Sequence, residues 1–293
     1  MVMFHLTFIE EEFPYAKEMV YTFHMPVFLV ISGYFLGRKG TANVRRRLVC
    51  VGLPYLIMES LYILMAARLQ INENIEGLSL PVFLEKLFWN PLGPYWFLLT
   101  IIIVTLVCRV IEMLTVRLPR LLQTLLLGLS VGALSLTGSL ALTPFYCFFV
   151  LAGILLGRSG REFEEFFHPS LLAFLPLAVM FSVPLNFSYY LVICASATYL
   201  MCSLLLAVFG LLPASVTRYT DFIGRNTLPI LLFSPFFTFS ARYLVPLFGF
   251  DPTHLLYLLV ATGISVAGSL LLALVLDKAG LSVILFGKKT VLV

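Results

Sequence analysis

The segment Phe23–Gly37 reads FHMPVFLVISGYFLG and guides the interpretation of the whole chain. It is an apolar run with a histidine and a proline near one end and Ser-Gly-Tyr near the other. An ionisable side chain at membrane depth is costly, so His24 is a candidate for a functional site. The cations Arg38, Lys39 and Arg45–Arg47 follow directly and can anchor the end of a membrane helix. The segment therefore predicts a membrane helix that contributes catalytic residues or lines a transport path.

The composition predicts an all-α polytopic membrane protein. Of 293 residues, 60% are hydrophobic and 12% are charged, with a mean hydropathy of +1.01. A soluble domain of this length could not cover so much apolar surface. At about 20 apolar residues per helix, the chain has nine predicted spans, near residues 19–36, 48–67, 95–114, 121–137, 140–156, 170–186, 189–211, 228–248 and 255–276.

The two ends of the chain complete this predicted organisation. Residues 1–9 are apolar but too short to cross, and we interpret them as the outer end of a tenth, partial first helix. We expect one transmembrane domain over residues 1–276, followed by a cytoplasmic tail at 277–293.

The positive charges predict the orientation. With alternate loops assigned to opposite sides, all but four of the 19 Lys and Arg residues fall on one side. The exceptions are Lys17, Arg68, Lys86 and Arg242. Cytoplasmic loops carry the excess of Lys and Arg, so the larger set is predicted to be cytoplasmic. The net charge of +4 then reflects membrane topology. The expected partner is the lipid bilayer, and no nucleic acid is expected to bind.

Small residues in the spans suggest packing roles. The five cysteines have no paired spacing, which favours packing over disulfide or metal roles: Cys50, Cys108, Cys147, Cys194 and Cys202. Gly128, Gly132, Gly263 and Gly268 are predicted to allow close approach of helices.

His5 and His24 flank an acidic outer loop that includes Glu10–Glu12 and Glu18. They lie on neighbouring antiparallel segments at similar depth, so we expect that they can meet in one polar cavity. Histidine suits general-base chemistry because its ordinary pKa is near 6.5. The alternative is that each histidine bonds a carbonyl group and fixes helix packing. No carboxylate or cysteine stands at ligand spacing around them, so no metal site is predicted.

Other polar residues give weaker predictions. Pro26 should kink the helix just after His24. Glu59 lies at membrane depth and is expected to be paired or to line the cavity. The segment Gly93–Leu98 is typical of an aromatic belt at the outer interface. Arg225 and Asn226 could contact a ligand or could cap and anchor a helix.

The basic loop Gly37–Arg47 has two interpretations. It could anchor the chain on anionic lipid. It could also bind a phosphate-rich cytoplasmic ligand, because arginine grips phosphate with two parallel hydrogen bonds.

Several segments, taken in order, resemble the acyltransferase-3 family of bacterial membrane acyltransferases, and within it the fucose 4-O-acetylase-like branch. They lie at residues 23–35, 46–55, 96–98, 148–153 and 223–228. The resemblance implies a ten-helix bundle in the bacterial cytoplasmic membrane. It also implies an O-acetyltransferase that moves an acyl group, commonly acetyl from acetyl-CoA, to a carbohydrate hydroxyl on the outer side, as in polysaccharide modification.

The resemblance also implies site residues. His5 stands where the family has a catalytic histidine, and we expect His24 to support it. Arg45, Arg46 and Arg47 would hold the phosphates of acetyl-CoA, with Ser32 and Tyr34 along the route between the two sites.

The chain departs from the family pattern at two places. An arginine of the family would precede Met1, so we expect an N-terminally truncated chain. Leu231 and Ser234 stand where the family often has tyrosine and histidine. A flippase of lipid-linked glycan and a catalytically degenerate homologue therefore remain open alternatives.

Overall fold

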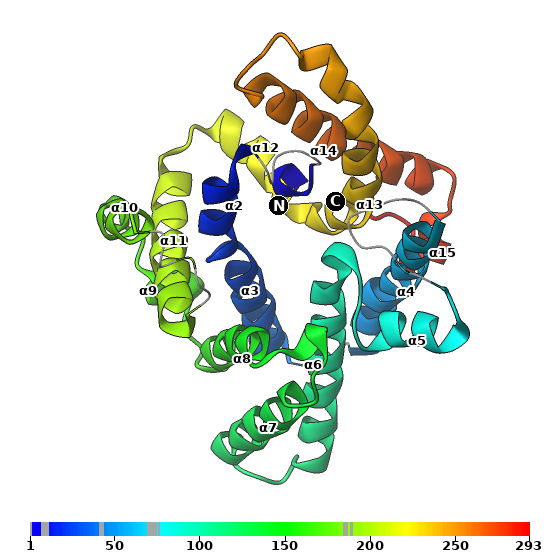
Figure 1. Ribbon diagram of the computed structural model, residues 1–293. Coiled ribbons are helices and arrows are strands. Elements are labelled where there is room, and N and C mark those ends of the chain that lie inside the picture. The colour runs from blue at the N-terminus through cyan, green and yellow to red at the C-terminus, as the bar shows by residue number, and fades with distance from the viewer. Residues whose placement is uncertain are drawn as a thin grey trace.

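The computed structural model confirms the predicted all-α membrane fold (Figure 1). It describes residues 2–6, 12–40, 44–68, 75, 77–183, 187 and 190–293. Within these ranges the chain is 81% helical and contains no strand. Helices satisfy their backbone hydrogen bonds internally, which is what a segment surrounded by hydrocarbon requires.

Among the described residues, six helical segments are long and apolar enough to cross a membrane. They are α2 (Pro14–Tyr21) with α3 (His24–Lys39), α4 (Val44–Arg68), η2 (Gly93–Tyr95) with α6 (Trp96–Leu114), α11 (Leu191–Leu211), α13 (Thr227–Ala241) with η6 (Arg242–Phe248), and α14 (Leu255–Lys278). Shorter apolar helices lie where three further spans are predicted: α7 (Arg120–Ser135), α8 (Pro144–Arg158), and η4 (Leu171–Ala173) with α10 (Phe174–Phe181). The total of nine full spans stays a prediction.

Short elements connect these helices. They are η1 (Val2–His5), α5 (Leu80–Phe88), η3 (Leu140–Leu142), α9 (Phe163–Phe167), α12 (Ala214–Arg225) and α15 (Ser282–Phe286). The predicted partial first helix is represented by the single 3-10 turn η1, and residues 7–9 of that prediction lie outside the described ranges.

Helices α3 and α8 pack backbone to backbone, and they lie side by side in Figure 1. Gly33 and Gly37 of α3 face Gly153 and Gly157 of α8. A Cβ atom at any of the four would overlap a carbonyl oxygen of the other helix. Small residues spaced by four let membrane helices approach this closely. The Ser-Gly-Tyr motif thus contributes Gly33 to this contact.

The glycines predicted for close packing are mostly not the ones that provide it. Gly128, Gly132 and Gly263 have open space where a Cβ atom would lie, and Gly268 faces the ring of Phe237. A sequence shows which residues are small but not which face of a helix meets another helix. The five cysteines are buried and free, in agreement with the packing interpretation.

The helix break associated with Pro26 lies before His24, so the predicted position after His24 was wrong. Helix α2 ends at Tyr21, a turn covers Thr22–Phe23, and α3 begins at His24. A proline removes the donor that would bond the carbonyl group four residues earlier. For Pro26 that carbonyl belongs to Thr22, which is where the helix is interrupted.

Three apolar clusters hold the described part of the bundle together. The first joins α3, α6, α7, α8 and α11 and includes Leu29, Val104, Leu127, Phe149 and Cys194. The second joins α4, α6, α13, α14 and α15 and includes Tyr55, Leu99, Leu232, Ala273 and Phe286. The third joins η1 to α13 and α14 through Phe4, Leu6, Ala241, Tyr257 and Ala261. Figure 1 shows the N-terminal segment beside α13 and α14 accordingly.

The residues after α14 fold back onto the bundle. The Asp277 carboxylate accepts hydrogen bonds from the amides of Val291 (2.9 Å) and Leu292 (3.1 Å). The buried Asn226 side chain accepts one from the amide of Val293 at 3.0 Å. Residues 277–293 therefore pack against the bundle, while their cytoplasmic position stays a prediction.

Candidate active site

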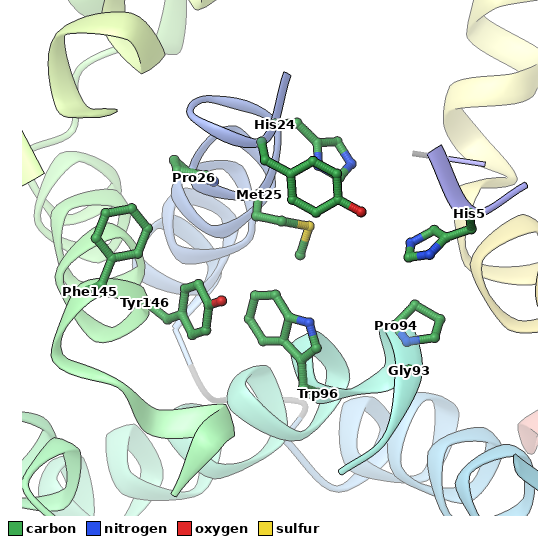
Figure 2. A pocket seen from close by; sticks show the side chains of 10 residues that line it. His5, His24, Met25, Pro26, Gly93, Pro94, Trp96, Phe145 and Tyr146 are labelled. Carbon is green, nitrogen blue, oxygen red and sulfur yellow. The ribbon is translucent and has the colours of Figure 1, made fainter. Parts of the chain in front are cut away.

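A cavity of about 170 Å³ lies where four separate segments meet (Figure 2). Its lining combines two histidines with several aromatic rings: His5, Tyr21, His24, Met25, Pro26, Gly93, Pro94, Trp96, Phe145 and Tyr146. These residues come from η1, the α2–α3 junction, the start of α6 and the start of α8. The structure thus brings the two histidines into one cavity.

His24 begins α3 directly after the helix break. Both of its ring nitrogens are buried and have no hydrogen-bond partner among the described residues. The ring makes edge contacts with Tyr21 and Phe28, whose centroids lie 6.0 and 5.6 Å away. Leaving a buried polar atom unsatisfied costs about 1–3 kcal/mol. The ring therefore carries two unsatisfied, buried polar atoms beside the cavity.

His5 reaches the cavity from a different part of the fold. The neighbouring Phe4 and Leu6 are buried against α13 and α14, while His5 itself is exposed. Figure 2 shows its ring pointing into the cavity, across from Met25 and His24. The buried neighbours fix the backbone and leave the imidazole accessible.

Trp96 and Tyr146 form one wall of the cavity. Their rings are stacked, with centroids 4.0 Å apart and an interplanar angle of 20°. Tyr146 is placed by the start of α8, where the Thr143 hydroxyl accepts a hydrogen bond from its amide at 3.3 Å and Pro144 occupies the first turn. Ser, Thr and Pro at these positions favour a helix start.

Gly93 and Pro94 form the wall near His5, and a buried carboxylate holds their segment. Glu59 of α4 is fully buried, and its Oε1 atom accepts a hydrogen bond from the Leu92 amide at 2.7 Å. Gly93 has a φ of +56°, and a Cβ atom there would strike the Tyr62 ring. Glu59 is therefore paired, as expected, and it supports the cavity wall without lining it.

The basic residues Arg38, Lys39 and Arg45–Arg47 lie at or after the C-terminal end of α3, away from His24. Arg38 is 14 residues after His24, or about 21 Å along a helix at 1.5 Å per residue. Arg38 pairs with Glu162 of the α8–α9 connection. Arg45 and Arg46 are exposed at the start of α4 and make no ion pair within the described residues, while Arg47 is half-buried.

Ser32 and Tyr34 do not line the cavity. Ser32 is half-buried on α3. Tyr34 is buried, accepts a hydrogen bond from Arg38 and donates one to the carbonyl oxygen of Arg161 at 3.3 Å. The roles predicted for them in acetyl-CoA binding stay predictions, and the observed contacts of Tyr34 anchor the α8–α9 connection.

The comparison with protein families agrees with this architecture. The profile of the family described as "Acyltransferase domain" (Acyl_transf_3) matches residues 1–274. The chain belongs to the acyltransferase-3 family. The match supports a multi-pass membrane acyltransferase. Comparisons with curated proteins and with solved structures found no significant match.

The acyltransferase-3 segments recognised in the sequence contribute unequally to the cavity. His24–Pro26 and Trp96 line it, whereas residues 46–55, 148–153 and 223–228 do not. Asn226 of the last segment is fully buried, and its amide donates to the carbonyl oxygens of Phe222 (2.8 Å) and Val293 (3.3 Å). It anchors the helix start rather than facing the cavity. Ser234 is also outside the lining and is buried in α13.

Sequence reasoning did not single out two residues of this candidate site, Phe145 and Tyr146, which belong to no motif. Trp96 was noted in the family segment 96–98 and in a predicted interfacial belt, but not as a cavity residue. Aromatic residues at membrane interfaces are common, so only their shared cavity distinguishes them. A usable sequence signal was the Thr143-Pro144 helix start, which predicts that the next two side chains lie at the helix end.

Proposed function

We propose that this protein transfers a short acyl group, acetyl from acetyl-CoA, to a hydroxyl group of a carbohydrate on the outer side of a bacterial cytoplasmic membrane. The supporting observation is the convergence of His5 from η1 and His24 from α3 on one cavity. A cavity of about 150 Å³ holds a molecule the size of benzene. The present cavity, about 170 Å³, accordingly suits an acetyl group beside one hydroxyl-bearing part of a sugar.

His5 acts as the general base in this proposal. The acceptor oxygen attacks the thioester carbonyl carbon and gives its proton to His5, and the carbon–sulfur bond then breaks. The proton returns from His5 to the departing thiolate. The accessible imidazole of His5 suits proton exchange, because histidine is the side chain that most often acts as a general acid or base. His24, whose buried ring nitrogens have no partner among the described residues, would hold the acceptor hydroxyl.

Acetyl-CoA is the proposed donor and enters from the cytoplasmic side. Its phosphates would bind Arg45, Arg46 and Arg47 at the start of α4. The first two are exposed cations without ion pairs in the described part of the chain. Arginine binds phosphate in a bidentate manner. The long arm of the donor would run along α3, which rises about 21 Å between His24 and Arg38.

The decisive experiment measures O-acetylation of surface polysaccharide in a strain that lacks the gene and carries variants in its place. His5→Ala should abolish the acetyl signal in the glycan while the protein remains at normal abundance in the membrane. His168→Asn is the matched control, because His168 is an exposed loop histidine with a φ of +40° that Asn tolerates. Full acetylation with His5→Ala would disprove the proposal.

A second experiment concerns the donor. Replacing Arg45, Arg46 and Arg47 with Gln should raise the KM for acetyl-CoA at least tenfold in purified protein, because each lost charge-assisted hydrogen bond contributes about 1.5–3 kcal/mol. The KM for the acceptor should remain unchanged. An altered membrane orientation with an unchanged KM would assign the cluster to lipid anchoring instead.

A further inference from the structure

Trp96 presents a hydrogen-bond donor to the cavity. Its Nε1 atom has no hydrogen-bond partner among the described residues, and it is not among their fully buried unsatisfied atoms. Figure 2 shows the nitrogen-bearing edge of the indole on the side of Pro94 and His5, with Tyr146 on the other side. The donor therefore faces the space where both proposed substrates would meet.

The Trp96 side chain is held in place on several sides. Its ring stacks on Tyr146 and makes an edge contact with Phe97, with centroids 6.4 Å apart. The main chain on either side is also fixed. The Tyr95 hydroxyl is buried and donates to the carbonyl oxygen of Leu232 at 2.7 Å, and Thr100 donates to the carbonyl oxygen of Trp96 at 3.0 Å. The N–H group is thus oriented before any substrate arrives.

We propose that the indole N–H of Trp96 donates a hydrogen bond to the carbonyl oxygen of the acyl group and stabilises the negative charge that this oxygen gains during transfer. The inference rests on the proposed function. When the acceptor oxygen adds to the thioester carbon, the carbonyl π electrons move onto the oxygen. They return when the carbon–sulfur bond breaks. A preoriented donor at this oxygen is stronger in the transition state than in the ground state.

The packing of Trp96 favours this role over stacking against a sugar ring. An aromatic platform for a sugar uses the face of the ring, but Tyr146 already covers one face of Trp96. The feature that remains available toward His5 is the nitrogen-bearing edge. A platform would contribute mainly to acceptor binding, whereas a donor to the oxyanion contributes to turnover.

Replacing Trp96 with Phe tests the donor, because Phe keeps an aromatic face and loses the N–H group. We expect kcat to fall about 100-fold to 1,000-fold, the range for loss of one oxyanion donor, with the KM for donor and acceptor within twofold of wild type. Trp89→Phe is the matched control. Trp89 is the other of the two tryptophans, it is exposed, and it does not line the cavity. Its kcat should remain unchanged.

A substitution that keeps the shape of the indole covers the case in which Trp96→Phe fails to fold. Benzothienylalanine at position 96 has sulfur in place of the N–H group and preserves the bicyclic ring. It should reduce kcat as strongly as Phe. A kcat within threefold of wild type for a folded variant, or a loss confined to the acceptor KM, would overturn the assignment. Inactive His5→Ala together with active Trp96→Phe would remove this inference alone, whereas active His5→Ala would remove the proposed function.

Fluorescence gives a readout that does not depend on turnover. In the Trp89→Phe protein, Trp96 is the single tryptophan. Addition of acetyl-CoA should shift or quench its emission, and the half-saturating concentration should match the KM. An emission spectrum that remains unchanged at saturating acetyl-CoA would place the acyl group away from Trp96 and contradict the proposal.

Discussion

Gly33 of α3 and Gly153 of α8 lie so close that a methyl group on either would overlap a main-chain carbonyl oxygen of the other helix. Main-chain atoms cannot move aside as a flexible side chain can. Gly33→Ala or Gly153→Ala should therefore lower the free energy of unfolding by about 1–3 kcal/mol, as overpacking typically does. Thermal unfolding of the protein in detergent measures the change.

Gly132→Ala in α7 is the control for these variants, because a Cβ atom there meets open space. Alanine is favoured over glycine in such a helix position. The unfolding midpoint of Gly132→Ala should therefore be unchanged or higher. Equal midpoints for Gly33→Ala and Gly132→Ala would show that the α3–α8 contact is looser than the structure indicates.

His24→Phe should separate stability from activity. The ring edges that contact Tyr21 and Phe28 are retained, and the two buried nitrogens, which have no partner in the described part of the chain, are removed. Removing an unsatisfied buried polar group relieves a cost of about 1–3 kcal/mol, and the adjacent cavity gives the larger ring room. We expect an unfolding midpoint equal to or above that of wild type, with acyl transfer reduced at least 100-fold. A lower midpoint would indicate that His24 has a structural partner.

The Arg38–Glu162 pair should make stability depend on pH. Hydrogen bonds from the Arg38 guanidinium lower the pKa of the Glu162 carboxyl below its usual value. A lowered pKa means that the pair stabilises the fold above the ordinary carboxyl range and loses this contribution as the pH falls below about 4. The unfolding midpoint of Glu162→Gln should therefore be lower than that of wild type at pH 7. At low pH the two midpoints should be equal.

Glu164→Gln, on the short helix α9 that Glu162 caps, provides the comparison for Glu162→Gln. Glu164 is exposed and makes no ion pair with another described residue. Its substitution should shift the midpoint little at any pH. An equal shift for both variants at pH 7 would mean that net charge, and not the Arg38 contact, determines the effect.

Asn226 and Asp277 should protect the last residues from proteolysis. Asn226→Ala removes the partners of Val293, and Asp277→Ala removes those of Val291 and Leu292. Each variant removes hydrogen bonds that hold the last three residues, at a net cost of about 0.5–1.5 kcal/mol per hydrogen bond. We expect trypsin to cut after Lys288 or Lys289 at least tenfold faster, as measured by mass spectrometry. Wild-type cleavage rates in both variants would show that other contacts hold this segment.

The fold was largely predictable because hydrophobicity alone places most of the helices. The meeting of His5 and His24 was predictable too, since the two residues are close in sequence and lie on neighbouring apolar segments. The stack of Trp96 on Tyr146 was not, because the two residues are far apart in sequence and meet only through the packing of α6 and α8. The same holds for Gly33 and Gly153, where a pattern of small residues does not say which helix lies opposite.

The main error in the interpretation of Pro26 has a local cause. The interruption was expected after His24, although the carbonyl group that loses its partner belongs to Thr22, four residues before the proline. Applying this offset would have placed His24 at a helix start facing a break. It would also have strengthened the prediction of a site there.

The two proposed catalytic histidines are held by different helices of the bundle. His24 is carried by α3, which the glycine contact joins firmly to α8, whereas His5 is carried by the turn packed on α13 and α14. The distance between the two imidazoles therefore depends on the position of the α13–α14 helix pair relative to the α3–α8 pair. A small displacement of one pair would widen or close the cavity without disturbing either helix contact, so substrate entry and catalytic alignment can be governed by a single relative motion.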